Sequence, residues 1–429
     1  MQNGYQETKI GAIPEEWKLE QLGNIGDFFK GKTITKSEIT ETGFPCIRYG
    51  DIYVQYEFAN TVTHFSAYIR KETAKIGRRL LKGDIIFAGT GETQEDIGKC
   101  VAYTRDEKAF AGGDLIVFRP NKDVGIDSEF LSYCLNTGEV ANRKSRLGQG
   151  LSIFHIYSSH LQTLEVPLPP LPEQKKITDI LSTLDNAIEK TDAIIEETKQ
   201  LKKGLMQKLF NEGIGHTRFK ETKIGRIPEE WQLLKLGQIA SFKNGANFPK
   251  EDIVDSGTLM VDVLNMYSEG IGMDLNKLYR VEVPLKSKHL LEAGDLLFVR
   301  SSLKKEGVGW SALFNGYSEP VAFCGFLIRA RLLSNAIYPR FLAYYLIAPK
   351  TRGRIISLSG TVTITNIGQE GLGKLSIPIP SIEEQHKIEK IFSEVDSKIE
   401  KENAIKKQLE KLKKALMQVL LTGKVRVKV

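Results

Sequence analysis

Cysteine is scarce in the sequence, and its spacing excludes two kinds of site. Four cysteines occur among 429 residues, at Cys46, Cys100, Cys134 and Cys324, and no two of them form a C-x-x-C pair. Disulfide-stabilised proteins are richer in cysteine, and zinc ligands usually come in closely spaced pairs. We therefore expect four reduced thiols and no structural metal.

Long apolar runs are also absent. No stretch reaches the roughly 20 residues of a membrane-spanning helix, and the N-terminus has no basic-then-apolar signal. The composition is otherwise that of a globular protein, with 41% hydrophobic and 26% charged residues. We expect a cytoplasmic protein, and the net charge of +7 permits a polyanionic partner without identifying one.

Catalytic motifs are missing as well. Gly91 and Gly98-Lys99-Cys100 have the wrong spacing for a phosphate loop, and Cys100 stands where a hydroxyl group would hold magnesium. His155 and His160 lie outside any H-E-x-x-H pattern, so we interpret them as structural histidines. No G-x-S-x-G occurs, nor an Asn-Pro-Pro-aromatic motif. The chain is predicted to catalyse nothing and to need no cofactor.

The sequence does contain a long internal repeat. The phrase ETKIGAIPEEW begins at Glu7 and returns as ETKIGRIPEEW at Glu221. Other pairs recur 211 residues apart: GDIIF at 83 and GDLLF at 294, FLSYCL at 130 and FLAYYL at 341, LKKGLMQ at 201 and LKKALMQ at 412. A constant offset over such a span indicates a tandem duplication of one unit.

Each repeat ends in a segment with helical periodicity. In residues 172–210 and 382–421, apolar residues recur with steps of four and three, which is typical of a coiled coil. The expected seam of the first helix is Ile180, Leu184, Ala187, Thr191, Ile194, Thr198, Leu201 and Leu205. That of the second is Ile391, Val395, Ile405, Leu409, Leu412, Leu416 and Val419. Because neither stripe is stable in water alone, we expect the helices to pair, antiparallel, as a spacer.

The segments before the helices have the pattern of short strands. GDIIFAGTGE and GDLIVFRP are β-branched and aromatic runs separated by glycine and aspartate. The fold class is therefore α+β, with two globular domains, each followed by a long helix of an antiparallel coiled coil. We expect domains at 1–171 and 221–381, helices at 172–210 and 382–421, a linker at 211–220, and a tail at 422–429 packed near the N-terminus.

The whole pattern resembles the specificity subunit of type I DNA restriction-modification systems. The resemblance rests on the I-P-x-x-W openings at Ile13 and Ile227, the G-D-aliphatic-aliphatic-Phe strands, the helix starts at 169–174 and 380–385, and the closing LTGKVRV. It implies a prokaryotic, non-catalytic subunit whose two target-recognition domains each read half of a bipartite DNA sequence. It also implies two modification subunits and the restriction subunits as partners, with S-adenosylmethionine, ATP and magnesium used only by them.

Candidate contacts follow from the basic and polar loops of the halves. The repeated motifs of the two halves match, whereas the loop residues between these motifs differ. The two domains should therefore read different base sequences. The expected DNA contacts are Arg48, Tyr49, Arg78, Arg79, Thr90, Gln94, Arg143, Lys144, Arg146, Arg300, Ser301, Ser302, Lys304, Lys305, Arg352 and Arg354. The expected partner interface comprises Pro169, Glu173, Gln174, Pro380, Glu384 and Gln385. Trp17 and Trp231 are interpreted as core anchors.

Two other functions remain open at this point. A coiled-coil scaffold with two protein-binding ends would show no footprint on DNA. A nuclease or methyltransferase with an atypical site would turn over substrate without partners.

Overall fold

The computed structural model describes residues 4–32, 34–56, 59–268, 270–361 and 365–428. The chain divides into two compact units. Unit 1 comprises Met1–Asp192 and Ile405–Val429, and unit 2 comprises Ala193–Ala404. Each unit therefore contains one globular domain together with a part of each long helix.

The first domain, in unit 1, is built on a four-stranded antiparallel sheet. Its order is β11 (Cys100–Ala102), β9 (Ile85–Ala88), β13 (Leu115–Pro120) and β4 (Gly26–Lys30). Helix α4 (Ser128–Leu135) packs on β11, and its N-cap Asp127 accepts a hydrogen bond from the Phe130 amide at 2.7 Å. Phe87, Phe118 and Leu131 are fully buried between sheet and helix. The short β-branched runs of the sequence thus form the core of the domain.

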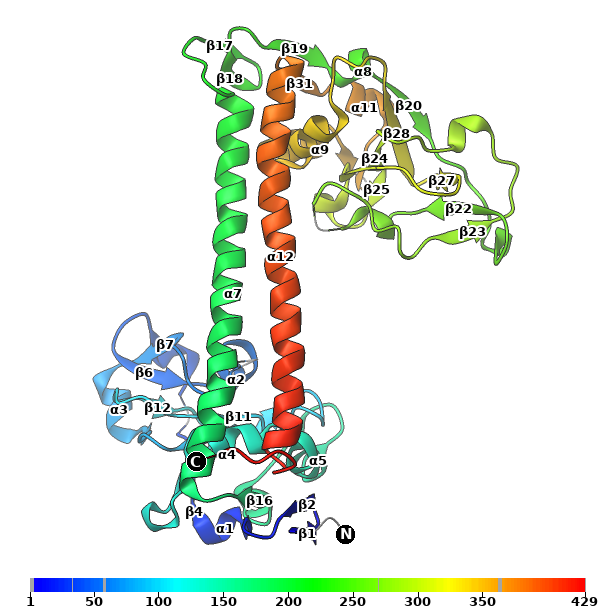
Figure 1. The fold of residues 1–429 in the computed structure, drawn as a ribbon. Coiled ribbons are helices and arrows are strands. Elements are labelled where there is room, and N and C mark those ends of the chain that lie inside the picture. The colour runs from blue at the N-terminus through cyan, green and yellow to red at the C-terminus, as the bar shows by residue number, and fades with distance from the viewer. Residues whose placement is uncertain (1–3, 33, 57–58, 269, 362–364, 429) are drawn as a thin grey trace. The chain divides into compact units, whose positions relative to one another are not determined.

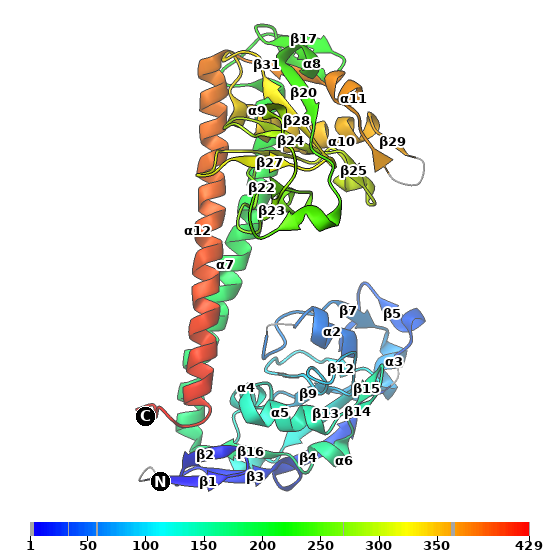
Figure 2. The ribbon, with the colours of Figure 1, turned by 90° about the vertical axis from the view of Figure 1, so that its right-hand side faces the viewer.

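A second sheet extends the first domain, as Figure 2 shows. It has the order β5 (Ile39–Thr40), β7 (Ala67–Ile69), β6 (Phe44–Ile47), β12 (Phe110–Ala111) and β8 (Arg78–Arg79). Strands β12 and β6 are parallel, and the other neighbours are antiparallel. This sheet carries two of the candidate cations, Arg78 and Arg79, on its edge strand.

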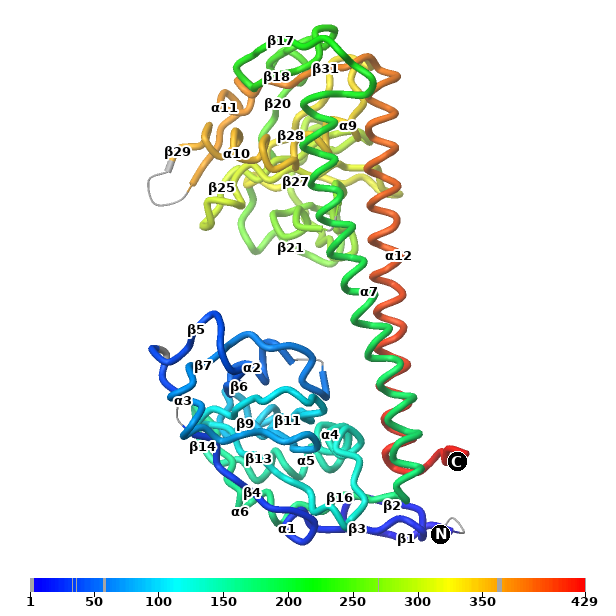
Figure 3. The backbone as a smooth tube through the Cα atoms, turned by 90° about the vertical axis from the view of Figure 1, so that its left-hand side faces the viewer, coloured from blue at the N-terminus to red at the C-terminus, as the bar shows by residue number. Residues whose placement is uncertain are grey.

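The second domain, in unit 2, repeats this arrangement (Figure 3). One sheet has the order β20 (Ala240–Asn244), β28 (Leu327–Leu332), β24 (Leu296–Val299) and β26 (Ser311–Leu313). The other has β21 (Ile253–Val254), β23 (Tyr279–Val281), β22 (Thr258–Val261) and β27 (Val321–Phe323), with a parallel pair between β22 and β27. Helix α9 (Pro339–Ile347) packs on β26 as α4 packs on β11. The tandem sequence repeat is therefore a repeat of the fold.

The two long helices are α7 (Leu171–Glu212) and α12 (Ile382–Leu420) (Figure 1). Within unit 1, Asp192 Oδ1 lies 2.6 Å from Lys406 Nζ, and Asp185 pairs with Lys413. Residue numbers rise along one helix as they fall along the other, so the helices are antiparallel there. In unit 2 the helices also pair, with Lys202 Nζ 2.5 Å from Asp396 Oδ1.

The observed seam differs in part from the expected one. Thr191 and Thr198 are buried, as expected. Ile194 and Leu201, however, are 37% and 58% exposed, and Ile195, which is outside the expected seam, is buried. In α12, Ile405 and Leu412 are likewise exposed, by 45% and 48%. Adjacent apolar residues such as Ile194 and Ile195 satisfy either frame, and the structure buries Ile195. At the start of α7, for example, Ile177 and Leu181 are buried in a cluster with Trp17.

Both ends of the described chain lie in unit 1 and contact each other. The Tyr5 hydroxyl donates to the Gly423 carbonyl oxygen at 2.9 Å, and Arg426 Nη2 lies 2.8 Å from Glu16 Oε2. Gly423 has a φ of +68°, and Gly213, which follows α7, has a φ of +66°. A glycine in the left-handed region thus turns the chain after each long helix.

The described residues show neither membrane nor metal features. Among them, no helix has both the length and the apolar character needed to cross a bilayer. No group of three or more histidine, cysteine or acidic side chains in these ranges could hold a metal ion. All four cysteines are buried as free thiols.

Candidate nucleic-acid interface

Each domain carries a small three-stranded sheet at its surface. In the first domain it consists of β10 (Thr90–Gly91), β15 (Phe154–His155) and β14 (Gln149–Gly150). In the second it consists of β25 (Ser301–Ser302), β30 (Thr365–Asn366) and β29 (Gly360–Thr361). Three of the expected base readers, Thr90, Ser301 and Ser302, therefore occupy equivalent edge strands.

Several expected cations of the first domain lie at the surface. Arg78 lies with its guanidinium carbon 4.9 Å from the centre of the Phe29 ring, and Arg79 beside it is exposed. Arg48 is bound by Asp51 through two hydrogen bonds of 3.2 and 2.8 Å, and these bonds raise the pKa of Arg48. That guanidinium stays permanently charged and partly exposed. The neighbouring Tyr49 is 45% exposed, and Gln94 is exposed in the turn after β10.

The cations of the second domain fall into two groups. Arg300, Lys304 and Lys305 are exposed around β25. Arg352, by contrast, is only 7% exposed, and its guanidinium donates to the carbonyl oxygens of Glu306 at 2.8 Å, Val308 at 2.7 Å and Gly309. Burial lowers the pKa of Arg352 to about 10. The prediction that Arg352 contacts DNA is corrected, because its guanidinium binds the loop after β25 from inside the domain.

Two further candidates are also engaged in the interior. Arg354 donates to the Tyr345 hydroxyl and to the Ser376 carbonyl oxygen at 3.3 Å. Lys144 is 3% exposed beside Asn136 and Cys100, and burial lowers its pKa. Lys144 faces away from solvent because α5 (Gly138–Arg146) packs it inward, whereas Arg354 on α10 (Pro349–Ser357) is only half-buried. Lys144 is therefore corrected to an internal residue, and Arg354 remains a predicted DNA contact.

The two remaining basic residues of α5 differ from each other. Arg143 donates to the Lys9 carbonyl oxygen at 3.0 Å and lies 3.5 Å from Glu165. Arg146 is exposed, 3.8 Å from Glu139. Arg146 is the more accessible of the two, since Arg143, whose side chain is 29% exposed, also fastens the N-terminal hairpin to the domain.

The expected partner interface lies largely inside the protein. Gln174 and Gln385 are buried. The side-chain oxygen of Gln174 accepts a hydrogen bond of 2.9 Å from the Asp127 amide, just before α4. The side-chain oxygen of Gln385 accepts one of 2.8 Å from the Tyr338 amide, just before α9. Pro169 and Pro380 are buried just before the helices. These four side chains join each domain to its helix, so they are corrected from partner contacts to internal ones.

The two glutamates of that interface anchor the tryptophans. Glu173, 2% exposed, accepts from Trp17 Nε1 at 3.1 Å and from Arg426 Nε at 2.7 Å. Glu384, in the other unit, accepts from Trp231 Nε1 at 2.9 Å and contacts His216 at 3.0 Å. Trp17 and Trp231 are each 1% exposed, which confirms their interpretation as core anchors.

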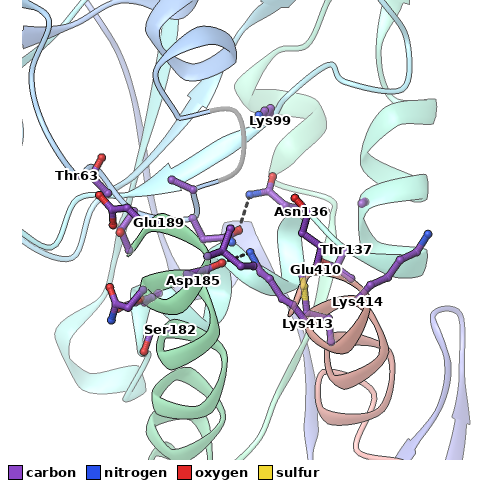
Figure 4. A pocket seen from close by; sticks show the side chains of 18 of the residues that line it. Thr63, Lys99, Asn136, Thr137, Ser182, Asp185, Glu189, Glu410, Lys413 and Lys414 are labelled. Carbon is purple, nitrogen blue, oxygen red and sulfur yellow. Dashed lines mark hydrogen bonds and ion pairs between the residues drawn. The ribbon is translucent and has the colours of Figure 1, made fainter. Parts of the chain in front are cut away.

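A cleft of about 1200 Å³ lies in unit 1 between the first domain and the helix pair. Figure 4 shows Asp185 of α7 and Lys413 of α12 pointing toward each other across it. Glu129, at the edge of α4, also lines the cleft. Burial, followed by the negative charges of Asp127, Asp185 and Asp179, raises the pKa of Glu129 to about 7.

Sequence inspection missed the residues that fasten the domains to the helices. In unit 1 the Tyr133 hydroxyl donates to Asp185, which also binds Lys413, and in unit 2 Tyr344, Asp396 and Lys202 do the same. All six positions are related by the 211-residue offset. Identity of a polar residue in both repeats is the signal that could have revealed them.

The repeat matches a known protein family. A model described as the type I restriction modification DNA specificity domain matches residues 14–200 and again residues 228–411. The chain belongs to the type I restriction-modification specificity subunits. Such a subunit recognises the DNA target within the restriction-modification complex and is its non-catalytic component.

Individual relatives agree with this membership along the full length. A protein of Methanocaldococcus jannaschii described as the specificity subunit of the MjaX type I restriction enzyme is 31% identical over 433 residues, covering 100% of this chain and 98% of the relative. The EcoKI specificity subunit of Escherichia coli is 24% identical over 420 residues, covering 91% and 85%. The crystal structure of the S subunit from M. genitalium shares the fold, with a TM-score of 0.58 at 20% identity, covering 94% and 96%.

Proposed function

We propose that the two domains of this specificity subunit read the two halves of an asymmetric, bipartite duplex DNA target. The observation that carries the proposal is the repeated three-stranded sheet. Its backbone is the same in both domains, whereas its side chains differ, as at His155 and Asn366. A common scaffold with different hydrogen-bonding groups is suited to reading different base sequences.

The proposed interface keeps the accessible part of the expected set. It comprises Arg48, Tyr49, Arg78, Arg79, Thr90, Gln94, Arg143, Arg146, Arg300, Ser301, Ser302, Lys304, Lys305 and Arg354. Arginine and lysine in this set contact phosphates and position the duplex, while the hydroxyl and amide groups face base edges. The domain bounds that belong to this proposal are 1–171 and 221–381, with the helical segments 172–210 and 382–421 as spacer, 211–220 as linker and 422–429 as tail.

The proposed assembly takes place in the cytoplasm of a prokaryotic cell. Two modification subunits, which are adenine methyltransferases, bind this chain and supply S-adenosylmethionine, and restriction subunits use ATP and magnesium. The polar side chains at the starts of the two helices are largely internal. The modification subunits therefore dock on the exposed faces of α7 and α12.

The test is sequencing of host DNA for modified adenines, with and without this gene. An asymmetric bipartite motif that is methylated only when the gene is present is the expected result. A methylome that stays unchanged while the modification subunit is expressed and bound to this chain would contradict the proposal. A footprint of the reconstituted complex on the motif is the independent check.

A further inference from the structure

A small groove in the first domain brings together side chains from four separate segments. It has a volume of about 170 Å³ and is lined by Lys30, Thr90, Asp114, His155 and Tyr157, among others. Lys30 ends strand β4, and Thr90 pairs with His155 across β10 and β15. The Thr90 hydroxyl and His155 Nδ1 share a hydrogen bond of 3.3 Å. Lys30, Asp114 and His155 are exposed, so their polar groups are accessible from solvent.

The second domain places other chemistry at the same backbone positions. Asn244 ends β20 as Lys30 ends β4, and Ser301 pairs with Asn366 as Thr90 pairs with His155. Phe326 accepts a backbone hydrogen bond from the Arg300 amide at 2.8 Å, as Asp114 does from the Gly89 amide at 2.8 Å. Figure 2 labels β4 and β15 in the first domain and β20 and β25 in the second.

Hydrogen bonds hold the amide groups of the second domain in place. The Gln369 amide donates to Asn244 Oδ1 at 2.9 Å, and the Ser301 hydroxyl donates to Asn366 Oδ1 at 2.5 Å. Asn244 and Asn366 are exposed, and the Phe326 ring beside them is 63% exposed. Oriented amides, together with an exposed aromatic ring, form a surface with a defined pattern of donors, acceptors and apolar contact.

Three of these four pairs differ in the way that base recognition requires, whereas Thr90 and Ser301 both present a hydroxyl group. Asparagine and glutamine amides suit the adenine edge, lysine suits the guanine edge, a carboxylate accepts from cytosine, and an apolar ring contacts the thymine methyl group. The placement of Arg78 and Arg300 is also informative. Arg78 Nε donates to the Lys30 carbonyl oxygen at 3.4 Å, and Arg300 directly precedes Ser301.

We propose that Lys30, Thr90, Asp114 and His155 in the first domain, and Asn244, Ser301, Phe326 and Asn366 in the second, are the base-reading positions of this subunit. Arg78 and Arg300 contact the phosphates alongside them. The inference rests on the proposed function and extends it, because it assigns Lys30, Asp114, His155, Asn244, Phe326 and Asn366 to sequence readout. It also gives His155 a role beyond that of a structural histidine.

The experiment compares single-domain variants of the full chain, each expressed with the modification subunit in a host that lacks the gene. His155→Ala and Lys30→Ala alter the first domain, and Asn366→Ala and Asn244→Ala alter the second. Lys122→Ala and Lys223→Ala are matched controls, because both residues are exposed in the same domains but lie on other segments: Lys122 follows β13, and Lys223 is in the turn between β17 (Phe219–Thr222) and β18 (Gly225–Pro228). Single-molecule sequencing then gives the methylated motif and the extent of methylation at each near-cognate sequence.

We expect each variant to relax discrimination by about tenfold or more at one or two base positions, since a bidentate contact contributes about 1–3 kcal/mol of selectivity. The change should be confined to one half of the motif, and variants of the other domain should affect the other half. Controls should keep the full motif. Asn366→Asp, which changes amide chemistry while keeping shape, should alter the preferred base rather than abolish methylation.

Two results would overturn the inference. If the variants keep the unaltered motif, or lose methylation equally at all sequences, these residues do not read bases although the proposed function stands. If the unsubstituted chain itself directs no motif, the proposed function fails, and this inference fails with it.

Discussion

The hydroxyl of Tyr133 donates a hydrogen bond of 2.5 Å to the carboxylate of Asp185. Tyr344 and Asp396 form the same bond at 2.7 Å in the other unit. Each aspartate also binds a lysine of the opposite repeat: Lys413 pairs with Asp185, and Lys202 pairs with Asp396. Every such cluster therefore fastens a domain to its own helix and joins that helix to its antiparallel neighbour.

Removing the carboxylate should weaken unit 1. We expect Asp185→Ala to lower the free energy of unfolding by about 2–4 kcal/mol, because it leaves a partly buried hydroxyl and ammonium group without their acceptor. Tyr133→Phe should cost about 1 kcal/mol. Urea titration monitored by circular dichroism is the measurement, and Lys190→Ala, an exposed change on the same helix, is the control. Equal midpoints for Asp185→Ala and Lys190→Ala would refute this role.

Glu129 should make stability depend on pH. Its pKa rises from 4.5 to about 7 on folding, so between these values the folded state binds more protons than the unfolded state. Stability should therefore fall as pH rises through this window and level off above about pH 7. Glu129→Gln removes the effect, so the variant should melt at a higher temperature than the wild type at pH 8. That difference should shrink toward pH 5, and a difference that is the same at both values would count against the prediction.

Arg352 should matter for stability and not for sequence readout. Arg352→Ala leaves the carbonyl oxygens of Glu306, Val308 and Gly309 without their donor, at an expected cost of about 2–4 kcal/mol. Arg352→Lys should rescue little, because one ammonium cannot reproduce the guanidinium geometry. Thermal unfolding measures the loss. An unchanged melting temperature combined with weaker DNA binding would return Arg352 to the interface.

Arg300 and Lys304 should behave in the opposite way. The double variant Arg300→Ala/Lys304→Ala should fold normally, since both side chains are exposed. The assembled complex should bind DNA less tightly, and its logarithmic salt dependence should become shallower by about 0.9 for each phosphate that the variant no longer neutralises. Fluorescence anisotropy over a range of salt concentrations measures both effects, with Lys288→Ala as the matched control. A slope identical to that of the control would exclude phosphate binding by these residues.

Glu173 should stabilise the junction between the first domain and α7. Glu173→Ala leaves the buried Trp17 Nε1 without its acceptor and leaves Arg426 with Glu16 alone, so the expected loss is about 1–3 kcal/mol. Glu384→Ala makes the matching change at Trp231 in unit 2. Differential scanning calorimetry should show that each variant lowers the midpoint temperature of an unfolding transition. If neither variant changes a midpoint temperature, the glutamates do not stabilise the domain–helix junctions.

Much of the fold could be predicted from repetition and periodicity. The 211-residue offset required two similar domains, and the long uninterrupted helical segments required partners for their apolar faces. The tryptophans were placed correctly as core residues because the same turn precedes both of them. The helix seam was placed only in part, because Ile194 and Ile195 are equally apolar and only packing in three dimensions buries one of them.

The candidate site was harder to predict because charge in the sequence does not reveal exposure. Arg352 and Arg300 have the same side chain, yet one binds three backbone carbonyls inside the domain and the other faces solvent. Gln174 and Gln385 had the polarity of interface residues, but loops nearly 50 residues earlier in the chain supply their partners.

The sequence by itself determined the duplication, the α+β class, the two long helices and the family, because these depend on local patterns and on letters that recur at a fixed offset. Tertiary structure alone decided which cations remain accessible and which polar side chains gather around the three-stranded sheets. Those properties depend on which segments, distant along the chain, supply hydrogen-bond acceptors and exclude water. Burial and partner choice are long-range, and no local pattern encodes them.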